Sequence, residues 1–201
     1  MLSGIILAGG RGRRMGNKRK ALLKIAGEPL ISRQIRLMAP VCAEILVVVD
    51  EPAAFSGIVP ADIRVLGDDD KYRGPLSGME RGLREAKERI AWVVACDQPF
   101  VSVAAAETLA QALQLSSADA AVVALDGTLE PLHGCYDAGC AKLAAEQLAQ
   151  GNTRVVDFLR NIRTVRLDET AFAKIADPRL FCFDIDTPKQ LAQARKWASR
   201  S

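Results

Sequence analysis

Glycines and basic residues gather in one short segment that suits the binding of a polyphosphate. Gly9-Gly10-Arg11-Gly12-Arg13-Arg14-Met15-Gly16 precedes Lys18-Arg19-Lys20. Glycines let the main chain approach a ligand and turn its N–H groups toward an anion, and arginine and lysine add positive charge. The segment is not a P-loop, because Asn17 follows Gly16, and not a dinucleotide fingerprint, because Met15 replaces the last glycine. We therefore expect a phosphate-binding loop of another type, with a plain glycine turn and solvated arginines as the alternative.

An aspartate follows the most apolar run of the chain. Trp92-Val93-Val94-Ala95-Cys96 leads directly into Asp97-Gln98-Pro99. A carboxylate at the carboxyl end of a central strand is poorly solvated, so it needs a partner. Mg²⁺ bound to phosphates is a natural one, because this ion takes oxygen ligands and few protein carboxylates. Asp97 is therefore predicted to be a metal ligand, and the N-cap of the next helix is the alternative.

A third group of acids lies near the end of the chain. Phe181-Cys182-Phe183-Asp184-Ile185-Asp186-Thr187-Pro188 suggests a strand that passes into a helix, with Pro188 at its first position. Alternation along a strand would place Asp184 and Asp186 on one face, where one of them joins Asp97 at the metal. Helix capping explains Asp186 or Thr187 equally well.

Apolar runs alternate with helical patterns along the chain. The expected strands are Gly4–Ala8, Ile45–Val49, Ile63–Leu66, Ile90–Cys96 and Ala120–Leu125. The expected helices are Leu30–Met38, Leu76–Arg89, Val103–Leu115, Gly139–Gln150, Thr153–Ile162 and Pro188–Ser199. Strands that are apolar on both faces predict an α/β fold with a single doubly wound, mostly parallel sheet and helices on both faces. One domain over residues 1–201 is expected, with ligands beyond the carboxyl ends of the strands.

Composition narrows the class of protein. The chain has 201 residues, of which 49% are hydrophobic and only 5% aromatic, and its formal net charge is +3. This balance argues against a nucleic-acid binder. The sequence has no apolar stretch of membrane-spanning length and no signal-peptide pattern, so we expect no membrane partner. The five cysteines form no C-x-x-C pair and indicate free thiols of a cytoplasmic protein.

Several motifs in this order resemble a known family. They are Leu-Ala-Gly-Gly-x-Gly-x-Arg-Met-Gly from Leu7, Lys20-Ala21-Leu22-Leu23, Gly27-Glu28-Pro29-Leu30, Gly74-Pro75-Leu76-Ser77-Gly78-Met79, Cys96-Asp97-Gln98-Pro99 and Glu130-Pro131-Leu132-His133-Gly134-Cys135-Tyr136. Together they are similar to the molybdenum cofactor guanylyltransferases, the MobA-like nucleotidyltransferases. The resemblance implies a Rossmann-like nucleotidyltransferase fold and the transfer of GMP from GTP to molybdopterin, with release of pyrophosphate. It also implies a molybdoenzyme or a cofactor-delivery protein as a further partner.

The resemblance also assigns roles to individual residues. It implies that Asp97 holds Mg²⁺ and that Lys20 contacts the phosphates. The expected chemistry adds that Lys20 and Arg13 stabilise the leaving pyrophosphate, and the alternation of the acids offers Asp186 as a second metal ligand. The nucleotide-binding set that it implies is Leu7, Ala8, Gly9, Gly10, Lys20, Asp50, Asp68 and Asp97.

Two features leave the substrate open. The family often has Asn-x-Asn-Thr-Pro where this chain has Asp184-Ile185-Asp186-Thr187-Pro188, a variant found in related cytidylyltransferases. Gly9 in Leu-Ala-Gly-Gly and the Gly74-Pro75-Leu76 loop favour guanine. The alternatives are a molybdopterin cytidylyltransferase, another NTP:phosphate-acceptor nucleotidyltransferase, or a non-catalytic nucleotide-binding module. His133 either faces the acceptor or is structural.

Overall fold

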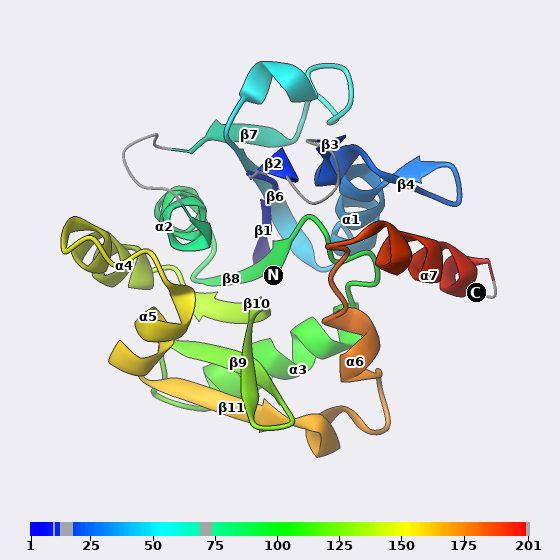
Figure 1. Cartoon of the computed structure of the whole chain (residues 1–201). Helices are drawn as coiled ribbons and strands as arrows, with labels where there is room; N and C mark the ends of the chain where they lie inside the picture. The colour runs from blue at the N-terminus through cyan, green and yellow to red at the C-terminus, as the bar shows by residue number, and fades with distance from the viewer. Residues whose placement is uncertain (10, 13–17, 69–73, 200–201) are drawn as a thin grey trace.

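A seven-stranded sheet forms the centre of the protein (Figure 1). The computed structural model describes residues 1–9, 11–12, 18–68 and 74–199. The strands of the sheet, in chain order, are β1 Leu2–Leu7, β6 Cys42–Val49, β7 Arg64–Gly67, β8 Ile90–Ala95, β9 Ala120–Leu125, β10 Thr128–Asp137 and β11 Thr164–Asp168. Two small antiparallel pairs lie apart from it: β2 Arg11–Gly12 with β3 Lys18–Arg19, and β4 Lys24–Ile25 with β5 Glu28–Pro29. The α-helices are α1 Leu30–Met38, α2 Pro75–Glu85, α3 Val103–Gln114, α4 Cys140–Ala149, α5 Val155–Asn161, α6 Pro178–Phe181 and α7 Pro188–Ala198, and 3-10 turns cover Lys20–Leu22, Pro52–Phe55 and Glu169–Phe172.

The sheet is mostly parallel and has helices on both faces, as the sequence predicts. Its strand order is β11-β9-β10-β8-β1-β6-β7, and β1 pairs in parallel with both β6 and β8. Helices α1 and α3 pack on one face, and α2, α4 and α5 pack on the other. All six residues of β1 are buried. Strands covered on both faces are nearly all apolar, which explains why the central strands are near-continuous hydrophobic runs.

Two strands of the sheet were not predicted. β10 is antiparallel to both β8 and β9, and its register shifts between Glu130 and Cys135. The shifted part contains Pro131 and also His133, whose φ of 74° lies in the left-handed region. A strand interrupted by a bulge loses its alternating pattern, so β10 resembles a loop in the sequence. β11 is a short strand at the edge of the sheet, with only partial burial.

The predicted strand over residues 181–187 is wrong. Phe181 ends α6, and residues 182–187, all of them described, have no strand pairing. Two of the apolar residues at alternate positions pack against the C-terminal helix instead: Ile185 shares a cluster with Leu191 and Ala194, and the Phe183 ring lies 4.9 Å from that of Trp197. Alternate burial against one helix therefore produces the same sequence pattern as a strand.

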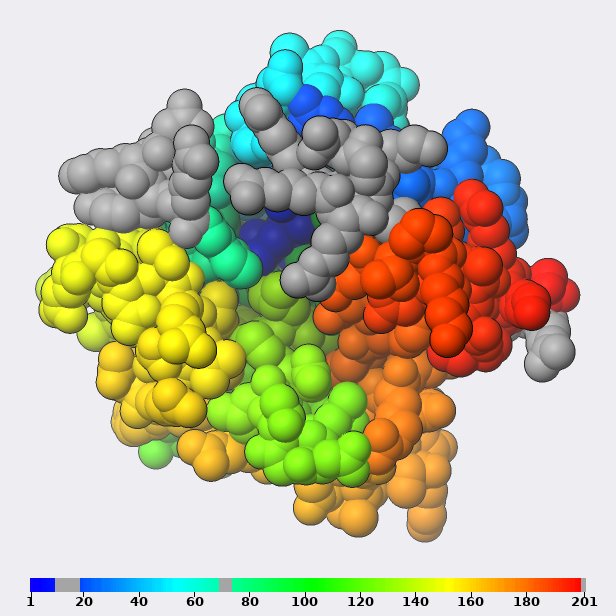
Figure 2. Space-filling model, in the orientation of Figure 1, coloured from blue at the N-terminus to red at the C-terminus, as the bar shows by residue number. Residues whose placement is uncertain are grey.

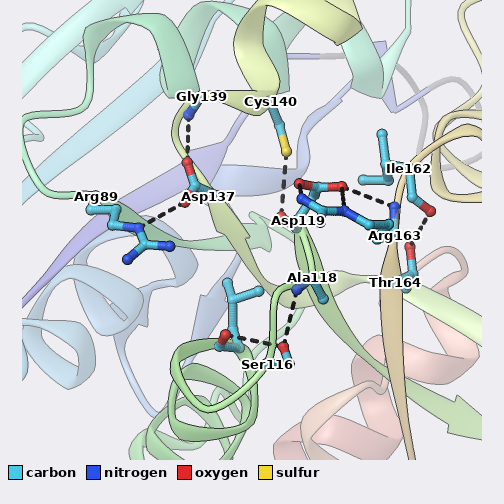
Figure 3. A network of polar contacts seen from close by, with 11 residues as sticks. Arg89, Ser116, Ala118, Asp119, Asp137, Gly139, Cys140, Ile162, Arg163 and Thr164 are labelled. Carbon is cyan, nitrogen blue, oxygen red and sulfur yellow. Dashed lines mark hydrogen bonds and ion pairs between the residues drawn. The ribbon is translucent and has the colours of Figure 1, made fainter.

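A polar network ties the strands together at the edge where the parallel strands begin (Figure 3). Asp119, just before β9, accepts hydrogen bonds from the Arg163 side chain at 2.8 and 3.1 Å and from its main-chain N–H at 3.0 Å. Arg89 and Asp137 join β8 to β10 at 2.9 Å. The opposite edge, where the parallel strands end, is left to the loops that carry the predicted site residues.

Helix α2 lies so close to β1 that one position has no room for a side chain. A Cβ on Gly82 would lie 2.6 Å from Ile5 Cγ2, whereas a Cβ on Gly78 would meet no described atom closer than 3.5 Å. Gly82→Ala is therefore expected to lower the free energy of unfolding by about 1–3 kcal/mol through overpacking. Gly78→Ala in the same helix is the control, and its stability should stay unchanged or rise by about 0.5–1 kcal/mol because alanine favours helix. Urea denaturation measures both, and equal stabilities would contradict the close packing.

Candidate active site

The predicted site residues lie together where three neighbouring strands end. Leu7 in β1 is in register with Val48 in β6 and with Ala95 in β8. The chain therefore leaves these strands at one edge of the sheet, toward Gly9, Asp50 and Asp97 respectively. In Figure 2 the end of β1 (dark blue) lies in the recessed centre of this face, between the teal, yellow-green and orange-red segments.

Lys20 and two carboxylates form the centre of the site. The Lys20 Nζ atom lies 2.8 Å from Asp97 Oδ2 and 2.6 Å from Asp186 Oδ1. The side chains of Lys20 and Asp97 are 18% and 17% exposed, and that of Asp186 is 45% exposed. Two carboxylates that lie far apart in the sequence thus contact one cation. We call this arrangement the Lys20 bridge.

Neither carboxylate of the Lys20 bridge serves as a helix cap. Ser102 caps α3, since its side chain accepts a hydrogen bond from the Ala105 N–H. Thr187 caps α7 by accepting from the Gln190 N–H, and Pro188 occupies the first turn as predicted. The capping explanations for Asp97 and Asp186 are therefore wrong, and both side chains are available to the site.

The segment that carries Asp186 is attached directly to the turn that carries Asp97. The Ile185 N–H donates to the Asp97 carbonyl at 3.0 Å. The fully buried Ile185 side chain anchors the same segment beneath α7. The relative position of the two carboxylates is thereby set by main-chain geometry and core packing.

The electrostatics of the site are dominated by clustered acids. Burial alone would lower the pKa of Lys20, but its hydrogen bonds and ion pairs with Asp186 and Asp97 outweigh burial, so its pKa is raised. Burial raises the pKa of Asp184 to about 7, with further contributions from the charges of Asp97, Glu130 and Asp186. Burial also raises the pKa of Glu130. The carboxylates of Asp97 and Asp186 thus favour the charged form of Lys20.

The predicted nucleotide-binding residues border this centre. The Leu7 carbonyl accepts from the Cys96 N–H and the Ala8 N–H donates to the Val48 carbonyl, so the sheet uses these groups. Gly9 is the first exposed residue after β1. A Cβ at this position would lie no closer than 3.8 Å to any described atom, the Asp50 nitrogen, so the fold itself has room for alanine here.

Two acids of the predicted nucleotide-binding set have side-chain partners that the sequence did not suggest. Arg19 Nη1 lies 3.3 Å from Asp50 Oδ1, and the same guanidinium contacts Glu51 and lies over the Phe55 ring. Ser77 Oγ, near the start of α2, donates to Asp68 Oδ1 at 2.7 Å. Sequence reasoning missed Arg19 and Ser77 because each acts through a side chain that meets its partner only in the folded chain. Gly10 and Arg13 lie outside the described residues.

His133 is structural. Its ring is fully buried between those of Trp92 and Phe181, at 5.2 and 4.5 Å, and its Nε2 atom accepts from the Ser102 N–H at 3.0 Å. Burial lowers its pKa to about 3. The imidazole is therefore neutral and supports the start of α3. The five cysteines, all within the described part of the chain, are buried free thiols.

The site suits a metal ion that binds together with phosphates. In the described residues, no group of three or more histidine, cysteine or carboxylate side chains could hold a metal by itself. Asp97 and Asp186 direct two oxygens at one point that a cationic group already occupies. Mg²⁺ commonly binds through one or two carboxylates together with substrate phosphates and water. The donor set of this site fits that pattern.

Two curated proteins are similar to this chain over nearly its whole length. The chain is 34% identical to a probable molybdenum cofactor guanylyltransferase of Pelotomaculum thermopropionicum, over 99% of this chain and 94% of the relative. It is 31% identical to the molybdenum cofactor guanylyltransferase of Pseudomonas aeruginosa, over 96% of this chain and 93% of that protein.

Solved structures share the fold. The crystal structure of molybdopterin-guanine dinucleotide biosynthesis protein A from Archaeoglobus fulgidus matches with a TM-score of 0.87 and 23% identity, over 100% of both chains. A 4-diphosphocytidyl-2C-methyl-D-erythritol synthase from Anaerococcus prevotii matches with a TM-score of 0.73 and 14% identity, over 99% of this chain and 96% of that one. These two likenesses show the fold of the chain.

The family itself is identified by its sequence model. The model of the MobA-like NTP transferase domain matches residues 4–167, which include Leu7, Lys20, Asp50, Asp68 and Asp97. The resemblance seen in the motifs is thus confirmed, and the chain belongs to the MobA-like NTP transferase family.

Proposed function

We propose that this protein transfers GMP from GTP to molybdopterin, with Mg²⁺ as its metal ion, and releases pyrophosphate. The observation that carries the proposal is the Lys20 bridge, because two carboxylates and a lysine at the end of the central strands can serve a metal-bound triphosphate. The names of the two bacterial guanylyltransferases support the choice of nucleotide and acceptor.

In the proposed reaction, a terminal phosphate oxygen of the acceptor attacks the α-phosphorus of GTP. A new P–O bond forms, the bond to the β-phosphate oxygen breaks, and pyrophosphate leaves with the electron pair. The acceptor phosphate is already anionic, so the chemistry needs positioning and charge neutralisation more than a strong base. Mg²⁺ would supply charge neutralisation at the α-phosphate, held by Asp97 with Asp186 as second ligand. Lys20 and Arg13 would stabilise the charge that develops on pyrophosphate.

The Lys20 bridge gives this mechanism a consequence for ligand binding. The ammonium lies between the same two carboxylate oxygens that we assign to the metal. Lys20 therefore has to leave Asp97 and Asp186 and move toward the phosphates when the nucleotide and its metal bind. Metal and nucleotide should consequently bind with positive cooperativity, because each removes an obstacle to the other.

The remaining predicted residues form the nucleoside side of the proposed site. The main chain at Leu7, Ala8, Gly9 and Gly10 would contact base and ribose. Asp50, held by Arg19, directly follows β6, and Asp68, held by Ser77, directly follows the neighbouring β7; both would contact the nucleoside. We further propose that the protein works as one cytoplasmic domain and passes its product to a molybdoenzyme or a delivery protein. No helix in the described ranges is long and apolar enough to span a bilayer.

Base choice provides the first test. Pyrophosphate release in the presence of molybdopterin should be about 10²-fold faster with GTP than with CTP at equal concentration, which is the discrimination that such contacts usually achieve. Gly9→Ala should reduce this ratio because the added methyl group would meet the purine or shift the amides near it. The fold should tolerate the variant, since the nearest described atom to the new Cβ lies 3.8 Å away.

The same assay separates the alternatives. A preference for CTP would exclude the guanine assignment and keep nucleotidyl transfer. If pyrophosphate is released only with a different phosphorylated acceptor, molybdopterin is excluded as the acceptor. Nucleotide binding by calorimetry without pyrophosphate release for any acceptor would indicate a non-catalytic binding module.

A further inference from the structure

One polar side chain is buried within the apolar stripe of α1. Gln34 is fully buried, and its neighbours on the same helix face are the buried residues Leu30, Ile31, Ile35 and Met38. Burying an amide is costly unless it forms hydrogen bonds. The bonds that Gln34 forms therefore indicate its role.

Gln34 holds the turn that carries Asp97. Its Nε2 atom donates to the Ala95 carbonyl at 2.6 Å and to the Gln98 carbonyl at 2.9 Å. These two residues are the ends of a turn closed by the Gln98 N–H donating to the Ala95 carbonyl at 3.1 Å. Asp97 lies inside this turn. One amide group thus fastens both ends of the four-residue segment that presents the carboxylate.

Other contacts make this turn rigid on the same side. Gln98 returns a hydrogen bond through Oε1, which accepts from the Ala95 N–H at 3.1 Å. Arg33, the neighbour of Gln34, donates from Nε to the Pro99 carbonyl at 2.9 Å. The turn is therefore held from α1 at three carbonyls, and its outward side faces Lys20 and Asp186.

The burial of the Gln34 amide is not explained by the stability of the fold. Its Oε1 atom is buried without a hydrogen-bond partner among the described residues. A buried carbonyl oxygen without a partner destabilises a fold. What the side chain provides is a pair of donors directed at the Asp97 turn.

We propose that Gln34 is a positioning residue that sets the location of the Asp97 carboxylate for the metal ion. The inference rests on the proposed function in one respect, namely that Asp97 is a metal ligand. Groups that orient metal ligands without touching the metal commonly change metal affinity by 10–100-fold when they are lost. Gln34 should therefore affect the metal-dependent part of nucleotide binding and leave the metal-independent part unchanged.

The test measures how much a metal ion strengthens nucleotide binding. Calorimetry gives the affinity for GTP with Mn²⁺ and, separately, with EDTA, and the ratio of the two is the contribution of the metal. Gln34→Met keeps the length of the side chain and removes both donors. We expect the ratio to fall about tenfold, while the affinity in EDTA stays within about twofold of the unaltered protein.

The chain offers a matched control on the other face of the sheet. Gln147 in α4 is also buried, and its Nε2 atom donates to two turn carbonyls, those of Asn152 and Arg154, at 3.4 and 3.1 Å. Gln147→Met removes the same chemistry from a turn that carries no metal ligand. For Gln147→Met, the ratio of the GTP affinity with Mn²⁺ to that with EDTA should equal the ratio of the unaltered protein. The stability of this variant in urea should nevertheless fall, as should that of Gln34→Met.

The outcomes separate this inference from the proposed function. An unchanged ratio in Gln34→Met, or an equal fall in Gln147→Met, overturns the positioning role and leaves the proposed function intact. A ratio of one for the unaltered protein with GTP and with CTP overturns the metal assignment and the role of Gln34 together. Gln34→Asn, whose amide is too short to reach both carbonyls, should show the same fall relative to Gln147→Asn, and it decides the question where Gln34→Met does not fold.

Discussion

Replacing Asp97 by asparagine is expected to reduce turnover on the order of 10²-fold or more. The substitution preserves shape but removes the charge that holds the metal at the α-phosphate, which costs several kcal/mol in the transition state. Lys20 would keep its contact with Asp186, so the local fold should persist. Pyrophosphate release under saturating GTP and molybdopterin measures the effect. The affinity for GTP in EDTA should change little.

The control for Asp97→Asn is another paired aspartate at the opposite edge of the sheet. Asp119 accepts two hydrogen bonds from the Arg163 side chain at 2.8 and 3.1 Å (Figure 3). Asp119→Asn weakens this structural pair and should leave turnover near normal. If Asp97→Asn retains near-normal activity at moderate Mg²⁺ concentration, Asp97 is not the metal ligand.

Replacing Lys20 by methionine should have opposite effects on the two ligands. Methionine has a similar length without the charge, so affinity for GTP with its metal, or the rate of transfer, should fall on the order of 10²-fold through lost phosphate contacts. Affinity for Mn²⁺ in the absence of nucleotide should rise on the order of tenfold, because no ammonium competes for Asp97 and Asp186. Calorimetry and the electron paramagnetic resonance of free Mn²⁺ measure the two affinities.

An exposed neighbour of Lys20 serves as the control for this pair of effects. Lys24 lies in β4, close in sequence and exposed to solvent. Lys24→Met should change neither affinity by more than about twofold, as expected for a solvated charge. If Lys20→Met weakens Mn²⁺ binding, the ammonium does not compete with the metal. If both variants have equal and small effects on GTP, Lys20 belongs only to a basic surface loop.

The sequence by itself was sufficient to predict the helices and strands whose apolar residues reflect burial. β9 begins and ends as predicted, and the run before Asp97 is indeed a central strand, because strands with helices on both faces are nearly all apolar. Helix α1 also has its predicted bounds, since its apolar residues recur at helical spacing. The position of Asp97 after such a strand already placed it at the ligand-binding edge of the sheet.

The pattern of apolar residues gave a wrong or incomplete assignment of secondary structure in two segments. In residues 181–187 the alternate apolar residues Phe183 and Ile185 are buried because they pack on α7, and β10 is concealed by the bulge around His133. Neither cause is visible in a short stretch of sequence, because each depends on an element that lies elsewhere in the chain. Helix α2 ends at Glu85 and not at the predicted Arg89, since Ala86 adopts an extended conformation.

Only the tertiary structure decided how the site is assembled. Lys20 meets carboxylates that lie 77 and 166 residues away in the sequence, and Gln34 reaches carbonyls more than 60 residues away. Spacing in the sequence predicts contacts within one helix or strand, but contacts between elements depend on how sheet and helices pack. The sequence therefore determined which chemistry the loops carry. The packing of α1 against the central strands, and of α7 against β4, α1 and the Ile185 segment, determined which side chains meet.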